Sequence, residues 1–301
     1  MKITLDITKL LDKGEISKEE YEKLLKLSSK DTGLLAINIL TAFGIVAVSC
    51  GVIALKPSLQ VLMLLGLLLA ALGIWILYNY QKQWRILGNI LLTIGSLIIS
   101  GSLFQYFNGD SVVFLLITII FLMAGIIAKS GLAVSLSVLT IAPLIKMGTG
   151  YLHASYFLFV EQPIITILVY SVLSYAAYFL SKRLEPEYER LSIIFSRVSL
   201  VMVNFGFWVG SLWGDKNFDL KITADILALL WAAALISTGV WAAKKNKRFA
   251  VNTVTTFGAI HFYTQWFERL GAKPITVVVG GIIAIAVSLW LWKYNTAAIK
   301  N

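Results

Sequence analysis

Four side chains that can take part in acid–base or ligand-binding chemistry recur at helical spacing near the end of the sequence. His261, Gln265, Glu268 and Arg269 occupy positions i, i+4, i+7 and i+8, which places them on one face of a helix. In an apolar stretch, such a face either forms hydrogen bonds between packed helices or lines a vestibule that binds a solute, an ion or a proton. The spacing of His261 and Glu268, about two turns, argues against a shared metal ion.

Two further charged residues, Lys146 and Asp225, lie inside apolar stretches. Each would cost about 2.5–3.5 kcal/mol at the centre of a membrane helix, so a mutual ion pair is one interpretation. Lys146 could instead reach the headgroups or contact a ligand, and we expect Arg197 to reach the headgroups at the opposite end. Pro143 predicts a kink nearby, which is either purely structural or the broken helix of a transporter site.

The motifs of common enzymes are absent from the sequence. It contains no Walker A loop, no H-E-x-x-H, no G-x-S-x-G and no dinucleotide fingerprint. Cys50 is the only cysteine, and there are two histidines. We therefore expect no enzyme activity, no cofactor and no metal site.

The residues that must position these groups are overwhelmingly apolar. Of 301 residues, 58% are hydrophobic and 14% are charged, whereas soluble domains carry about 25% charged residues. This composition excludes an ordinary soluble enzyme, a nucleic-acid binder and a disordered chain. It predicts a polytopic membrane protein, whose partner is the lipid bilayer.

A membrane span requires about 20 predominantly apolar residues. Ten windows approach this length: 33–55, 59–80, 84–105, 111–128, 131–150, 163–181, 191–213, 222–242, 249–267 and 274–292. Because the fourth window is short and Pro143 interrupts the fifth, the number of spans is nine or ten, and we expect ten. The spacing of Gly88, Gly95 and Gly101 predicts close helix packing.

The basic residues predict the orientation of these spans. With the N-terminus in the cytoplasm, 19 of the 26 Lys and Arg residues fall in cytoplasmic segments and five in outer loops. This distribution obeys the positive-inside rule with both termini cytoplasmic. The net charge of +10 is thus explained by topology and by anionic lipid, and we expect no nucleic-acid partner.

The first 32 residues predict a small amphipathic helical hairpin. Gly14 fits the end of the first helix, while Ser17 and Glu20 have the spacing of a capping box at the start of the second. We expect the hairpin to lie on the inner leaflet or against the protein's own loops, or to form a homo-oligomer or partner contact. Its predicted contact residues are Ile16, Tyr21, Leu24 and Leu25.

Two stretches resemble a known family. These are the hairpin and the segment 95–140, in which Tyr106, Gly109 and Asp110 form an aromatic-x-x-Gly-Asp turn. Together they resemble the bacterial family of integral membrane proteins called domain of unknown function 2157. The resemblance covers the N-terminal half and implies a multi-pass protein of the bacterial inner membrane, with no assigned reaction.

The sequence therefore predicts an all-α bundle of about ten transmembrane helices in the cytoplasmic membrane. Residues 1–32 form the cytoplasmic hairpin, 33–293 the bundle and 294–301 a short cytoplasmic tail. The first functional hypothesis is a transporter or permease for a small solute or lipid, with an outward polar vestibule. The alternative is a membrane scaffold or regulatory protein that associates through its hairpin.

Overall fold

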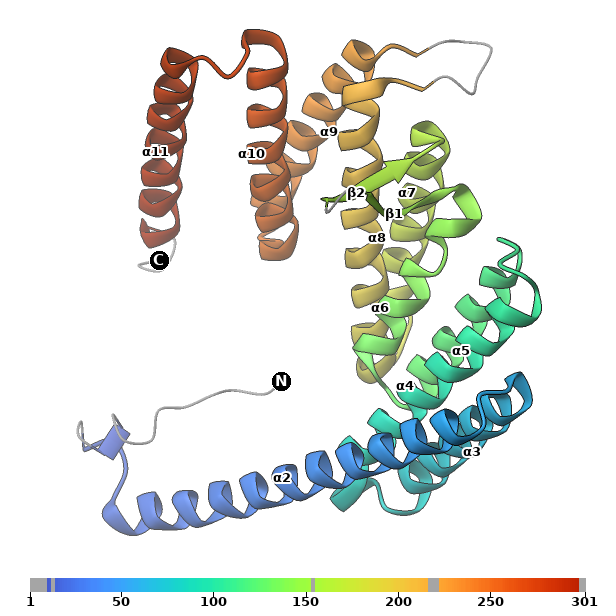
Figure 1. Cartoon of the computed structure of the whole chain (residues 1–301). Helices are drawn as coiled ribbons and strands as arrows, with labels where there is room; N and C mark the ends of the chain where they lie inside the picture. Colours follow the sequence, from blue (N-terminus) through green and yellow to red (C-terminus); the bar gives the residue numbers. More distant parts are fainter. Residues whose placement is uncertain (1–9, 12–13, 153–154, 216–221, 298–301) are drawn as a thin grey trace. The chain divides into compact units, whose positions relative to one another are not determined.

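The computed structural model describes the backbone of residues 10–11, 14–152, 155–215 and 222–297 (Figure 1). The chain divides into two compact units, residues 1–137 and 138–301. The first unit holds α2 (Lys18–Leu55), α3 (Leu59–Asn79), α4 (Gln81–Tyr106), α5 (Val113–Ile127) and most of α6 (Gly131–Leu139). The second holds η1 (Ala142–Ile145), β1 (Met147–Leu152), β2 (Ser155–Val160), α7 (Pro163–Ser181), α8 (Pro186–Trp213), α9 (Ala224–Lys244), α10 (Arg248–Leu270) and α11 (Pro274–Ala297).

The largely helical fold is confirmed, and its helices are apolar. In the described part of the chain, six helical segments are long and apolar enough to cross a membrane: Leu35–Leu55, Leu59–Asn79, Gln83–Tyr106, Pro163–Ser181, Pro186–Trp213 and Ala224–Lys244. Shorter apolar helices cover Val113–Ile127, Gly131–Ile145 and Pro274–Ala286. The predicted count of about ten spans stays a prediction.

The turn of the N-terminal hairpin has the two predicted local motifs. Gly14, at φ +71°, donates to the Leu11 carbonyl, and Glu15 donates to that of Leu10, which is the hydrogen-bond pattern of a Schellman motif after the helical residues Leu10 and Leu11. Ser17 then caps α2 in a capping box with Glu20. Among the predicted contact residues Ile16 and Tyr21 are half-buried and Leu24 is exposed, while the side chain of Leu25 lies outside the described residues.

We expect this capping box to open in acid. The Ser17 backbone N–H donates to the Glu20 carboxylate at 2.8 Å, and this bond lowers the pKa of Glu20 below its ordinary 4.5. The contribution of Glu20 is complete above that value and is lost as the pH falls through the lowered pKa. The protection factor of the Ser17 amide, the ratio of its intrinsic exchange rate to its observed rate at the same pH, should fall over that range, more than the protection factors elsewhere in α2.

Alanine at Glu20 should abolish the acid-dependent fall in the protection factor of the Ser17 amide. Alanine at the neighbouring Glu19, which is also in the first turn of α2, is the matched control and should preserve it. Equal behaviour of the two variants would contradict the assignment of the effect to Glu20.

Helix α2 is continuous across the predicted domain boundary at residue 32, since it runs from Lys18 to Leu55. Its buried Asn38 inserts into the hydrogen-bond ladder of α4, where Trp84 has non-helical dihedrals. The Asn38 amide donates to the Gln83 carbonyl and accepts from the Leu87 N–H, both at 3.1 Å. This side chain therefore satisfies the two backbone groups that a regular helix would pair with each other.

Helices α3 and α4 approach each other through glycines. A Cβ on Gly95 would lie 2.5 Å from the Ala70 nitrogen, and one on Gly73 would lie 2.6 Å from the Leu92 nitrogen. The predicted packing role of Gly88 and Gly95 is thus confirmed. It is wrong for Gly101, whose added Cβ would meet no described atom within 4 Å.

The prediction of a helix across the whole fifth window, 131–150, is wrong. Helix α6 ends at Leu139, η1 contains Pro143, and Lys146 adopts a left-handed conformation at φ +54°. Strands β1 and β2 then pair antiparallel, from Met147 opposite Val160 onwards. Pro143 removes a backbone donor and so stops the helix, which leaves the segment after it to pair as a hairpin.

Helices α7 and α8 are joined by serine hydroxyls. Ser174 donates to the Ser196 carbonyl at 2.9 Å, and Ser196 donates back to the Ser174 carbonyl at 2.8 Å. Ser192 adds a bond to the Ala177 carbonyl at 2.7 Å. Hydroxyls that bond across an interface allow two apolar helices to associate in a lipid environment.

Candidate functional site

The second unit contains the helix face formed by His261, Gln265, Glu268 and Arg269. We call the end where α8 passes to α9 and α10 to α11 the outer end, and the end where α9 passes to α10 the inner end. These names follow the orientation predicted from the basic residues.

At the outer end, α9 and α10 are joined by charge. Arg269 of α10 forms an ion pair with Asp225 of α9 at 2.5 Å, and it also donates to the Gln265 side chain at 3.4 Å. Gln265 in turn donates to the Ser211 carbonyl of α8 at 3.5 Å. The structure thus brings three of the predicted residues together, while Glu268 is exposed.

The predicted Lys146–Asp225 pair is wrong. The Lys146 ammonium lies 3.5 Å from the Glu161 carboxylate, and its carbonyl accepts the Glu161 N–H at 3.1 Å. The hairpin β1–β2 causes this pairing, because it returns the chain to the position next to Lys146. Both side chains are more than half exposed, so the pair stabilises the hairpin only weakly.

About one helical turn from Gln265 towards the inner end, His261 lies against the fully buried Trp231. The rings of His261 and Trp231 meet edge to face with centroids 4.8 Å apart. Within the described part of the chain, the buried Nδ1 of His261 has no hydrogen-bond partner. An orphaned ring nitrogen leaves an unused donor or acceptor at this depth.

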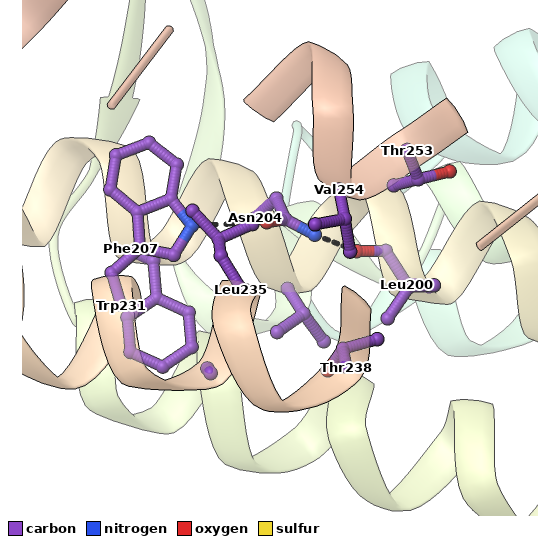
Figure 2. A pocket seen from close by; sticks show the side chains of 10 residues that line it. Leu200, Asn204, Phe207, Trp231, Leu235, Thr238, Thr253 and Val254 are labelled. Carbon is purple, nitrogen blue, oxygen red and sulfur yellow. Dashed lines mark hydrogen bonds between the residues drawn. The ribbon is translucent and has the colours of Figure 1, made fainter. Parts of the chain in front are cut away.

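Trp231 is itself held by a buried amide. Its indole N–H donates to the Asn204 side chain at 3.0 Å, and the Asn204 amide donates to the Leu200 carbonyl at 2.8 Å (Figure 2). Trp231 is 0% exposed and Asn204 is 6% exposed. This pair connects α8 to α9 in the middle of the unit, and sequence reasoning missed it because neither residue is charged.

A small cavity adjoins the Asn204–Trp231 pair on its inner side (Figure 2). Its volume is about 40 Å³, which is large enough for a water molecule. Besides the pair, its lining comes from α8, α9 and α10: Leu200, Val203, Phe207, Ala234, Leu235, Thr238, Thr253 and Val254.

A second cavity, of about 730 Å³, follows towards the inner end and shares Leu200, Val203 and Thr238 with the first. Residues of α7, α8, α9 and the start of α10 line it, and it is open to the surface, since Tyr175 and Trp241 of its lining are 72% and 44% exposed. Neither cavity is lined by His261, Gln265 or Glu268. Of the residues predicted for a vestibule, His261 packs on Trp231, Gln265, Glu268, Arg269 and Asp225 lie nearer the outer end, and Lys146 lies at the start of the β1–β2 hairpin.

The larger cavity is lined by three cations, Arg197, Lys247 and Arg248. The sequence assigned Lys247 and Arg248 to topology and predicted that Arg197 reaches the headgroups. The guanidinium of Arg197 lies over the Phe249 ring, 4.8 Å from its centroid, a favourable cation–π geometry. The sequence feature that could have identified Arg197 as a cavity residue is its position, about 16 Å along the helix from Pro186 at the start of α8. That depth separates it from the lysines of the turns.

Comparisons with known proteins found no match to this chain among family models, curated proteins or solved structures. The resemblance of the hairpin and of residues 95–140 to domain of unknown function 2157 stays a prediction.

Proposed function

We propose that this protein is a membrane carrier for a small solute, and that the second unit contains the binding site. The observation that carries the proposal is the cavity of about 730 Å³ between α7, α8, α9 and α10. Binding pockets for small molecules have volumes of about 300–1,000 Å³ and combine apolar walls with a few polar groups.

The arrangement of polar groups along the unit supports a carrier over a simple binding protein. The small cavity, which shares lining residues with the large one, adjoins the Asn204–Trp231 pair. His261 packs on Trp231, and the Arg269–Asp225 pair lies further along α10 and α9. A cavity at the inner end that is closed by polar contacts towards the outer end is expected of one state in alternating access. The orphaned His261 nitrogen is a group that a solute or water would meet when those contacts open.

Cysteine labelling tests the proposal. With Cys50 replaced by serine, T238C should react with a membrane-impermeant thiol reagent in inside-out vesicles, because Thr238 lines both cavities. A carrier also exposes this position to the opposite side, so labelling in right-side-out vesicles should be slower but measurable. The control is I236C. Ile236 is on the same helix, is 68% exposed and lines neither cavity, so in a membrane it faces lipid. There an apolar surrounding suppresses the thiolate, and we expect little labelling.

Labelling of T238C from the inner side alone would contradict a carrier. It would then favour the alternative, a membrane scaffold or regulatory protein that associates through residues 1–32. Equal labelling of T238C and I236C would show that the reagent does not report the cavity, and the assignment of the cavity as the solute site would fail.

A further inference from the structure

The larger cavity has a strongly one-sided charge. Arg197 enters it from α8, and Lys247 and Arg248 enter it from the start of α10. None of the described residues that line it is acidic. In the described part of the chain, neither the Lys146–Glu161 nor the Arg269–Asp225 ion pair includes any of the three cations. All three side chains are exposed, and together they give the lining a locally positive potential that attracts an anion.

Topology accounts for Lys247 and Arg248, which belong to the basic residues predicted on the cytoplasmic side, but it does not account for Arg197. Arg197 lies well inside α8, and its stacking on Phe249 directs the guanidinium towards the first turn of α10. That turn has no side-chain cap hydrogen bond, so its backbone N–H groups add donors beside the cations.

The remainder of the cavity is lined by apolar, aromatic and uncharged polar residues. Tyr178 and Trp241 pack edge to face near the inner end, with centroids 6.3 Å apart. Leu200 and Val203 line the deeper part. The hydroxyls of Ser174 and Ser196 also face the cavity, but they already bond to each other's helix. The charge of the lining is therefore confined to the three cations.

We infer that the cavity binds an anionic amphiphile, with a phosphate or carboxylate head on Arg197, Lys247 and Arg248 and a hydrocarbon chain along Leu200 and Val203. This inference deepens the proposed function by naming the class of solute. It also assigns Arg197 as a ligand-binding residue, in place of a side chain that merely reaches the headgroups.

Binding to the purified full-length protein in a neutral maltoside detergent tests the inference. The probe is radiolabelled oleoyl lysophosphatidate, and the competitors are inorganic phosphate and oleoyl lysophosphatidylcholine. We expect saturable binding that unlabelled lysophosphatidate displaces at least about tenfold more effectively than either competitor, since each lacks the chain or the net anionic head. Equal competition by phosphate would overturn the amphiphile, and equal competition by the choline lipid would overturn the anionic head.

Charge-matched variants locate the site. R197Q/K247Q should weaken binding by about tenfold or more, because it removes two charge-assisted contacts. R183Q/K245Q removes the same charge at the same end, outside the cavity lining, and should change affinity less than about twofold. Thermal unfolding of both variants checks the fold, and K247Q alone, in the turn before α10, provides the test if the double variant unfolds. Equal weakening by the two double variants would overturn the site.

The experiment separates this inference from the carrier proposal. Binding in detergent does not require transport, whereas T238C labelling does not require an anion. Two-sided labelling without lysophosphatidate binding would refute the ligand class alone. Binding with one-sided labelling would refute the carrier alone.

Discussion

Valine at Gly95 should destabilise the first unit by about 3 kcal/mol or more, at the upper end of overpacking effects. A Cβ there would lie 2.5 Å from the Ala70 nitrogen and 2.7 Å from the Gly66 carbonyl oxygen. Both atoms belong to the backbone of α3, so no rotamer change can relieve the clash and the two helices must separate. Detergent-solubilised protein should lose helicity at a lower temperature, as measured by circular dichroism.

The matched control is G101V, on the same helix. An added Cβ at Gly101 meets no described atom within 4 Å, so this variant should unfold near the wild-type temperature. Both variants place the same residue on the same helix, and the two sites differ in how closely other atoms approach the added side chain. Similar unfolding of G95V and G101V would contradict the close approach of α3 and α4.

Replacing Trp231 with alanine should cost about 3–5 kcal/mol, the range for truncating a large buried aromatic residue. The indole is 0% exposed, packs against His261 and donates to Asn204. W231A would leave a cavity and an unpaired Asn204 acceptor. Denaturant titration followed by far-ultraviolet circular dichroism should show the loss.

Two variants distinguish volume from hydrogen bonding at this site. W231F keeps most of the volume and should cost less, because it mainly leaves Asn204 without its donor, worth about 1–3 kcal/mol. W213A truncates a tryptophan that is 63% exposed on α8 and should have a small effect. A loss for W213A as large as that for W231A would refute the central role of the buried pair.

Local patterns in the sequence predicted local structure correctly. The positions of Gly14, Ser17 and Glu20 specified the hairpin turn, because caps and Schellman motifs involve residues within a few positions of each other. Gly88 and Gly95 likewise predicted a close helix contact. The same spacing argument failed at Gly101, since helix spacing defines a face without identifying what that face meets.

Long-range pairing was harder to predict. Lys146 and Asp225 were matched by depth, but the strands after Pro143 placed Glu161 beside Lys146, and α10 placed Arg269 beside Asp225. A β-hairpin after a broken helix was not anticipated, because the apolar window 131–150 was read as one span. Hydropathy measures how apolar a segment is, and it does not distinguish a strand from a helix.

Composition was sufficient to predict the apolar helical character of the chain, and residues close in sequence were sufficient to predict the capping of the first turn of α2. Which polar residues share a cavity depends on how the helices pack. Arg197 and Lys247 are 50 positions apart, yet the packing of α7, α8, α9 and α10 places both at one site. The direction that each helix faces depends on contacts distributed over the whole unit, and periodicity within one helix cannot specify it.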